Sequence, residues 1–141
     1  MGIYPQEEDF LIYKGKYFVA EWYYTGHGKI PARAYYLSLD EVDRRGFMHL
    51  VTLFCDTRPG QLLPKTMYRV EDSVNKIYAF KPRNERYFNF TTFGAKVIVT
   101  NAYHKHSQEM TKLDLNELRL AAKLRADFMI RVMERTYYEK D

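Results

Sequence analysis

Two histidines and a lysine follow one another within three positions, shortly after an apolar run. The run, residues 96–100, reads Lys-Val-Ile-Val-Thr, and His104, Lys105 and His106 come soon after it. Histidine suits proton transfer because its ordinary pKa of ~6.5 lies close to neutrality. Lysine supplies a positive charge that stabilises a phosphate or an oxyanion. The stretch therefore indicates one of three things: acid–base chemistry on an anionic substrate, part of a metal site, or a solvated strand end.

A metal site would need more ligands than this stretch supplies. His104 and His106 share one face if the chain is a strand there, with Cα atoms roughly 6.6–6.8 Å apart. Zinc sites use three or four ligands, and the other histidines, His27 and His49, lie in a predicted turn and a predicted helix. Cys55 is the single cysteine, and no Cys-x-x-Cys, His-Glu-x-x-His, Walker or dinucleotide-binding motif occurs. We therefore expect no bound metal and no cofactor.

The excess positive charge of the chain lies in the segment that contains these residues. Residues 76–112 carry seven lysines and arginines against two glutamates, whereas the rest of the chain has 15 basic and 16 acidic residues. The segment also contains seven tyrosines and phenylalanines. Basic residues interleaved with aromatic rings are typical of surfaces that bind single-stranded nucleic acid. A sheet edge whose charges prevent aggregation would have a similar composition, so both interpretations stay open.

Metal-free RNA cleavage uses residue types that this segment supplies. The ribose 2′-hydroxyl is the nucleophile, so a protein must remove its proton, neutralise the phosphorane and protonate the leaving oxygen. Histidine can transfer these protons, and arginine binds the phosphate in bidentate fashion. The candidate catalytic residues are Arg86, His104, Lys105 and His106, and the candidate RNA-binding residues are Lys81, Arg83 and Tyr103.

Hydrophobic periodicity predicts the strands that position these residues. Aromatic and β-branched residues indicate one or two strands at residues 10–24, broken near Gly15. Short turns separate three further strands, at residues 76–82, 85–93 and 95–104, which predicts an antiparallel meander.

Regular alternation on the last strand divides its polar residues between two faces. His104 and His106 would share one side, and Tyr103 and Lys105 the other. Only one pair can then face a groove directly. We expect His106 to lie in the groove, with Lys105 reaching it after the strand ends.

Three helices are predicted. Pro31 begins the first, over residues 31–42. The second covers residues 44–56, and the third begins after Asp114, the expected N-cap, with Glu117 as its capping-box partner. The expected inward residues are Tyr35, Leu39 and Val42 in the first helix, Phe47, Leu50, Val51 and Phe54 in the second, and Leu115, Leu118, Ala122, Met129 and Val132 in the third. The expected solvent-facing residues of the third helix are Lys123, Arg125, Arg131 and Arg135.

The order β-α-α-β-β-β-α predicts an α+β fold with helices on one side of a small antiparallel sheet. The 141 residues fit one domain, residues 1–141, with residues 1–16 as a candidate N-terminal extension. No apolar run approaches the ~20 residues of a membrane span. The lone Cys55 cannot form an internal disulfide, which favours a reducing compartment. We therefore expect a cytoplasmic protein without a membrane partner.

A succession of short motifs follows from residue 77 onwards. It reads Ile-Tyr-Ala-Phe-Lys at residues 77–81, Arg-Tyr-Phe-Asn-Phe at 86–90, and an apolar strand running into Tyr-His-Lys-His-Ser-Gln at 103–108, followed by a helix rich in Leu, Ala and Arg. In order and spacing it resembles the RelE/HigB-type toxins of bacterial type II toxin–antitoxin systems, in particular the phage-related HigB branch. The resemblance covers about residues 17–135 and implies the RelE-like β-α-α-β-β-β-α order.

The resemblance implies a function and partners. Such toxins are metal-independent mRNA endoribonucleases, most of which act on messages bound to the ribosome and so inhibit translation. A helix-turn-helix antitoxin of HigA type holds the toxin inactive, and the pair reaches operator DNA only through the antitoxin. Toxins of the same fold also include gyrase poisons that are not nucleases. A non-nuclease toxin, or a degenerate module that binds RNA or the antitoxin, is therefore the alternative.

The resemblance also implies roles for particular residues. Arg86 corresponds to the family's strand arginine, which would contact the scissile phosphate, and Lys81 stands where the family often has arginine. Tyr103 takes the place of the aromatic residue before the family's Lys-Lys pair. Lys105 and His106 fall near that pair, with His106 as the general acid or base and the other histidine of the run as its competitor. The family's Lys-Thr-Pro is replaced by Glu-Met-Thr at residues 109–111.

Overall fold

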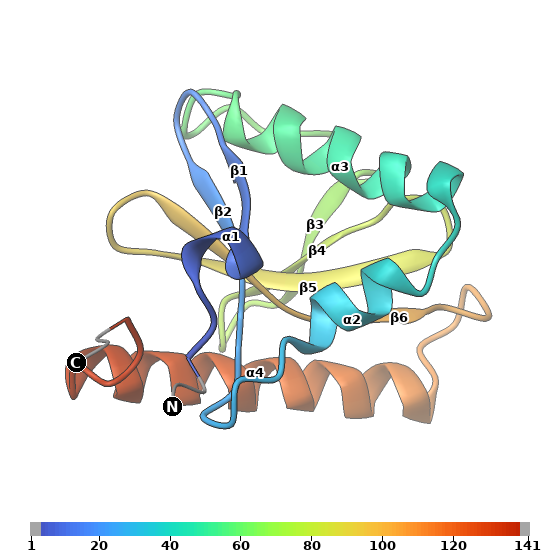
Figure 1. The fold of residues 1–141 in the computed structure, drawn as a ribbon. Coiled ribbons are helices and arrows are strands. Elements are labelled where there is room, and N and C mark those ends of the chain that lie inside the picture. The colour runs from blue at the N-terminus through green and yellow to red at the C-terminus, as the bar shows by residue number, and fades with distance from the viewer. Residues whose placement is uncertain (1–3, 139–141) are drawn as a thin grey trace.

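Alternation of apolar and polar residues builds the sheet that carries the candidate site. The computed structural model describes residues 4–138, and over this range the fold is α+β, with a six-stranded mixed sheet and four helices (Figure 1). The elements in chain order are α1 (Glu7–Phe10), β1 (Leu11–Lys14), β2 (Val19–Trp22), α2 (Pro31–Leu37), α3 (Glu41–Cys55), β3 (Tyr68–Asp72), β4 (Ile77–Phe80), β5 (Glu85–Thr92), β6 (Lys96–His104) and α4 (Lys112–Met133).

The sheet combines antiparallel and parallel pairings in the order β1-β2-β6-β5-β4-β3. The predicted antiparallel meander is confirmed for β4, β5 and β6. The expectation of a wholly antiparallel sheet is wrong, because β2 pairs parallel with β6, with Val19 opposite Lys96 and Trp22 opposite Val99. Two helices and three strands separate β2 from β6 in the chain. A connection of this length permits parallel pairing, which no local pattern in the sequence reveals.

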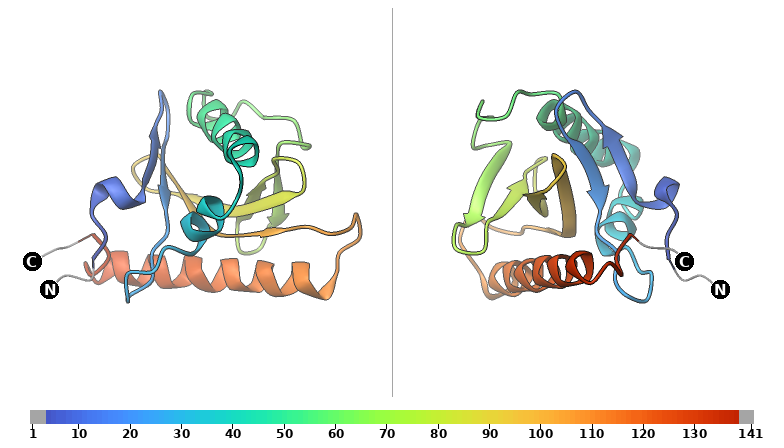
Figure 2. Two further views of the ribbon diagram at one scale, coloured as in Figure 1. Left: turned by 45° about the vertical axis from the view of Figure 1, so that its right-hand side comes forward. Right: turned by 90° about the vertical axis from the view of Figure 1, so that its left-hand side faces the viewer.

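Helices cover both faces of the sheet. Figures 1 and 2 show α3 over one face and α4 along the other. On β5, Tyr87 stacks on Phe47 of α3 with ring centroids 3.9 Å apart, whereas its neighbour Phe88 belongs to a buried cluster with Ala121 of α4. The prediction of helices on one side is therefore wrong. Since β5 carries buried apolar residues on both of its faces, each face needs a covering layer.

A short break divides the helix predicted over residues 31–42. The Asp40 side chain accepts a hydrogen bond from the backbone N–H of Asp43 at 2.9 Å and so caps a new helix, α3. Val42 falls in the first turn of α3 and is 52% exposed, so its predicted inward position is wrong. The predicted stripe on α3 is confirmed by the burial of Phe47, Leu50 and Val51.

The last helix begins earlier than expected. Thr111 is the N-cap, since its hydroxyl accepts from the backbone N–H of Asp114 while Asp114 accepts from the backbone N–H of Thr111 at 2.8 Å. This reciprocal capping box places Asp114 in the first turn, so its prediction as the cap is wrong. Leu115, predicted inward, is 40% exposed. Arg131, predicted to face solvent, instead donates to Asp127 at 2.9 Å with a side chain only 13% exposed.

The sequence did not predict β3, the edge strand beyond β4. It reads Tyr-Arg-Val-Glu-Asp, and three of its five residues are charged. An edge strand tolerates such charges because one of its sides faces solvent. At the other end of the chain, one or two strands were predicted over residues 10–24, and the structure has two, β1 and β2, separated near Gly15.

Candidate active site

Pairing of β5 with β6 brings predicted catalytic residues together at one end of the sheet. Arg86 lies directly opposite Tyr103. One step beyond the last strand pair, the backbone N–H of Lys105 donates to the carbonyl oxygen of Asn84 at 2.7 Å. The residues that follow His104 are thus held beside the start of β5.

Strand alternation sends neighbouring side chains to opposite faces. Tyr103 faces α4, where its hydroxyl donates to Asp114. The Nδ1 atom of His104 lies 3.0 Å from Oε2 of Glu85, and Glu85 also accepts a hydrogen bond from Tyr35 of α2. The predicted division of Tyr103 and His104 between two faces is therefore confirmed.

Asp114 anchors the α4 side of the site. Its carboxylate accepts hydrogen bonds from Tyr103, from Thr111 and from Nζ of Lys105, the last at 2.9 Å. Burial on its own raises the pKa of Asp114, but these hydrogen bonds outweigh it and hold the pKa well below its ordinary range. A buried carboxylate in this setting stays ionised at neutral pH.

Tyr103 is a buried hydrogen-bond donor. Burial, and after it the hydrogen bond to Asp114, raises the pKa of the Tyr103 phenol well above its ordinary value, so the phenol stays protonated. Its ring packs 5.7 Å from that of Phe88, and the residue is 8% exposed. Tyr103 was predicted to bind RNA, but little of its ring is open for stacking on a base.

Two hollows meet at Arg86 and Lys105. The inner hollow, of about 90 Å³, lies between the sheet and α4, and its lining includes Arg69, Glu71 and Tyr103. The outer hollow, of about 290 Å³, lies at the strand end and is lined by Asn84, Arg86, His104, Lys105, His106, Ser107 and Gln108. Both predicted histidines and two of the predicted cations therefore share one open concavity.

Arg86 is the cation between the two hollows. It is half-buried, and its Nη1 atom donates to the carbonyl oxygens of Arg83 at 2.8 Å and of Glu85 at 2.9 Å. Within residues 4–138 it forms no salt bridge with a carboxylate. Burial lowers the pKa of Arg86, although arginine remains charged at neutral pH. The rest of its guanidinium is therefore free of carboxylate partners and could bind an oxyanion.

The two histidines contact each other in the outer hollow. Their ring centroids are 4.9 Å apart, with the ring planes at 66°. The side chain of His104 is 45% exposed, whereas that of its partner Glu85 is 7% exposed. His104 is therefore held from the protein side while the rest of its ring is open. His106 lines the same hollow.

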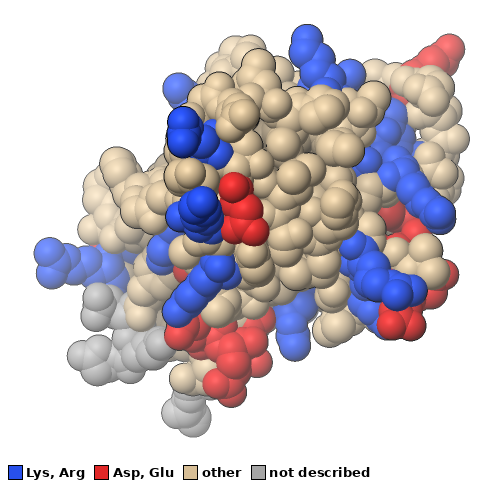
Figure 3. All heavy atoms as spheres, turned by 90° about the horizontal axis from the view of Figure 1, so that it is seen from above, with Lys and Arg blue, Asp and Glu red and all other residues tan. Residues whose placement is uncertain are grey.

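The two other predicted RNA-binding residues, Lys81 and Arg83, do not line the outer hollow; they line a separate hollow next to α3. Lys81 donates from Nζ to the carbonyl oxygen of Lys65 at 3.2 Å, and burial, followed by the nearby Arg69 and Arg86, lowers the pKa of Lys81. The Arg83 side chain is 74% exposed. On the face seen in Figure 3, lysine and arginine side chains form separate groups around an uncharged centre rather than one continuous patch.

Sequence reasoning missed four residues of this site. Arg69 and Glu71 come from the unpredicted strand β3, and Asp114 was assigned only a capping role. Glu85 was counted only as a charge that opposes the basic segment, although the predicted hairpin could have placed it opposite a histidine. Glu85 could therefore have been predicted from the register of the hairpin, whereas Arg69 could be found only from the three-dimensional structure.

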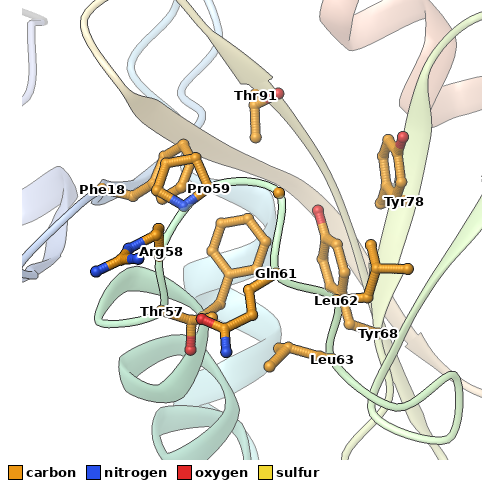
Figure 4. A pocket seen from close by; sticks show the side chains of 12 residues that line it. Phe18, Thr57, Arg58, Pro59, Gln61, Leu62, Leu63, Tyr68, Tyr78 and Thr91 are labelled. Carbon is orange, nitrogen blue, oxygen red and sulfur yellow. The ribbon is translucent and has the colours of Figure 1, made fainter.

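A more apolar pocket lies away from these residues. Figure 4 shows Leu62, Tyr68 and Tyr78 around it, and its volume is about 210 Å³. The rings of Tyr68 and Tyr78 stack with centroids 5.4 Å apart. None of the predicted site residues lines this pocket, so it does not contribute to the chemistry considered above.

Among the described residues, no three His, Cys, Asp or Glu side chains are grouped so that they could hold a metal ion. None of the described helices combines the length and the apolar character that crossing a membrane requires. The chain matches no model of a known protein family, and a comparison with curated proteins gave no match.

Proposed function

We propose that the protein is the toxin of a type II toxin–antitoxin pair and acts as a metal-independent endoribonuclease on mRNA, chiefly on ribosome-bound message. The observation that carries this proposal is the outer hollow. There the paired ends of β5 and β6 place Arg86 and Lys105 beside His104 and His106. This set combines phosphate-binding cations with two imidazoles, the side chain that most often acts as general acid or base.

Each step of RNA cleavage has a matching group in the outer hollow. One histidine accepts the 2′-hydroxyl proton as the 2′ oxygen attacks phosphorus, and the other protonates the 5′ oxygen as its bond to phosphorus breaks. Arg86 stabilises the phosphorane with N–H donors that no carboxylate occupies. Lys105 uses two of its three N–H donors on Asp114 and on the Glu109 carbonyl oxygen, at 2.9 and 3.1 Å, and has a third for the substrate.

The RelE-like topology is part of the same proposal. It is supported by the order of the elements, since setting α1, β1 and β3 aside leaves β2-α2-α3-β4-β5-β6-α4. In this interpretation β1 and β3 are additions at the two edges of a RelE-like sheet. The partners that follow are a HigA-like helix-turn-helix antitoxin, mRNA on the ribosome, and operator DNA through the antitoxin alone. The location that follows is the cytoplasm.

Arg86→Ala tests the proposal. We expect induction of the wild-type protein to arrest growth and produce cleaved transcripts, and the variant to lose cleavage on the order of 10²-fold or more, since one charge-stabilising donor is removed. Arg119→Ala is the matched control, because Arg119 is exposed on α4 and, among the described residues, its side chain hydrogen-bonds only to Asn116. Thermal unfolding of each purified variant separates loss of function from loss of fold. Undiminished arrest by Arg86→Ala would overturn the proposed role of this arginine.

A second candidate function is a non-nuclease toxin or a module that binds RNA or the antitoxin. The favouring observation is that Tyr103 and Lys105 are both held by Asp114, as in a structural network. DNA-damage signalling after induction, or no effect on growth, together with intact transcripts would support this second function. A small helix-turn-helix reading frame beside the gene would support either kind of toxin.

A further inference from the structure

A chain of three side chains runs from α2 to the outer hollow. The Tyr35 hydroxyl donates to Oε1 of Glu85, and Oε2 of Glu85 lies 3.0 Å from Nδ1 of His104. Glu85 is buried, whereas the His104 side chain is about half exposed. The two oxygens of one carboxylate thus contact two different partners, one on the protein side and one at the site.

The hydrogen-bonding capacity of each group determines where the protons lie. An ionised carboxylate only accepts hydrogen bonds, so the His104 Nδ1 atom that contacts it must carry a proton. Burial, and after it the hydrogen bond to Glu85, raises the pKa of Tyr35 well above its ordinary value, so this hydroxyl remains a donor. With Nδ1 protonated, the neutral imidazole has its lone pair on Nε2.

We infer that Glu85, fixed by Tyr35, is a positioning residue that holds His104 in the Nδ1–H tautomer, so that Nε2 of His104 is the base for RNA cleavage. The inference rests on the proposed function for its substrate. In the step it implies, Nε2 takes the 2′-hydroxyl proton and the 2′ oxygen forms a bond to phosphorus. The bond from phosphorus to the 5′ oxygen breaks, and that oxygen takes a proton from His106. The products are a 2′,3′-cyclic phosphate and a 5′-hydroxyl.

The family resemblance left His106 as general acid or base with His104 as its competitor, and the hydrogen bonds distinguish the two histidines. His106 has no carboxylate partner in the described residues and contacts the ring of His104. His104 has the buried carboxylate, which orients its ring and selects its tautomer. His104 is therefore the general base, and His106 is the general acid that protonates the leaving 5′ oxygen.

Glu85→Gln separates positioning from mere packing. The glutamine has almost the same shape, but it offers one acceptor oxygen and one NH₂ group. Because the Tyr35 hydroxyl is a donor, the amide oxygen of the glutamine should accept its hydrogen bond. The NH₂ group of the glutamine then points towards Nδ1 of His104. His104 must then accept at Nδ1 and carry its proton on Nε2. Adding Tyr35→Phe removes the donor that fixes the amide, so the amide can rotate and the original tautomer should partly return.

The test is two-bond ¹⁵N–¹H NMR of the purified full-length protein at a pH where imidazole is neutral. The chain has four histidines, so His104→Gln assigns the signal of interest. We expect Nδ1–H for His104 in the wild type, Nε2–H in Glu85→Gln, and partial recovery in the Tyr35→Phe/Glu85→Gln double variant. Glu109→Gln, an exposed carboxylate in the same loop, is the control and should leave the tautomer unchanged.

RNA cleavage by the same variants gives the second measurement. We expect Glu85→Gln to reduce cleavage on the order of 10²-fold, the usual scale of acid–base catalysis, with partial rescue in the double variant. A wild-type His104 protonated on Nε2, or a tautomer that Glu85→Gln leaves unchanged, would overturn the inference. A wild type that has the expected tautomers but cleaves no RNA would instead overturn the proposed function and leave the hydrogen-bonding assignment standing.

Discussion

Asp114 connects the first turn of α4 with the end of β6. It takes part in the capping box of the helix, accepts the Tyr103 hydroxyl and forms a salt bridge with Lys105 at 2.9 Å. Its side chain is 4% exposed. A buried carboxylate that accepts hydrogen bonds from three residues orders them around it, and removing its charge leaves their donors without a full partner. One residue therefore sets both the start of a helix and the position of a candidate catalytic lysine.

Asp114→Asn should lower stability in a pH-dependent way. At pH 7 we expect a loss of about 2–4 kcal/mol, since a buried charge pair is broken and a phenol loses a strong acceptor. The folded-state pKa of Asp114 lies below its unfolded value, so its contribution is fully present above the unfolded pKa of ~3.9. That contribution is lost as the pH falls from there towards the folded-state pKa. Urea unfolding at pH 7 and pH 3 gives the free energy of unfolding of the wild type and of Asp114→Asn.

The difference between wild type and Asp114→Asn should therefore shrink at pH 3. Glu109→Gln removes an exposed carboxylate from the same loop and should show little difference at either pH. An Asp114→Asn difference that is the same at both pH values would show that the charge does not carry the effect.

At the scale of elements, the N-terminal hairpin is joined to the end of α3 by a close backbone approach. A Cβ built on Gly15 would lie 2.4 Å from Cβ and 2.7 Å from the carbonyl oxygen of Cys55. The backbone N–H of Tyr17 donates to that same carbonyl at 2.8 Å. Glycine at this position therefore lets β1 and β2 pack against the end of α3. Replacing Cys55 with alanine would not make room for a side chain at position 15, because alanine keeps the Cβ.

Gly15→Ala should destabilise the protein by about 1–3 kcal/mol, the usual cost of overpacking a contact that includes backbone atoms. Gly26→Ala is the matched control, because a Cβ there meets nothing within 4 Å, and it should change stability by less than about 0.5 kcal/mol. Chemical denaturation of both variants gives the comparison. Equal stability of the two variants would refute the close-packing argument.

Local patterns in the sequence predicted the elements whose pairing is also local. The hairpin of β5 and β6 followed from alternation and a short turn, and it placed Arg86, His104 and Lys105 at one end of the sheet. The parallel pairing of β2 with β6 and the charged edge strand β3 were not predictable in this way, since both depend on contacts between distant segments. For the same reason Arg69 and Asp114 entered the site only with the three-dimensional structure.

At the scale of the whole molecule, folding divides the basic segment of residues 76–112 between two ends of the sheet. Lys76 lies in the turn before β4, and Lys96 begins β6, where it pairs with Glu21 at 3.1 Å. Arg86 and Lys105 lie at the opposite end of β5 and β6. The basic residues are thus close together in the sequence but do not form one surface. Arg86 and Lys105 lie at the end of the sheet that carries the histidines, and Lys76 and Lys96 lie at the other end.

This division predicts how salt should affect RNA binding. Each cation that contacts a phosphate of single-stranded RNA adds about 0.7 to the slope of log affinity against log salt concentration, because it releases a condensed counterion. Arg86→Ala should therefore lower the magnitude of that slope by about 0.7 for a short single-stranded RNA. Lys76→Gln removes a charge from the same sequence segment at the other end of the sheet and should leave the slope unchanged. Fluorescence anisotropy across a salt series measures both variants, and an equal loss of slope in the two would place the RNA on the segment as a whole instead of at the strand end.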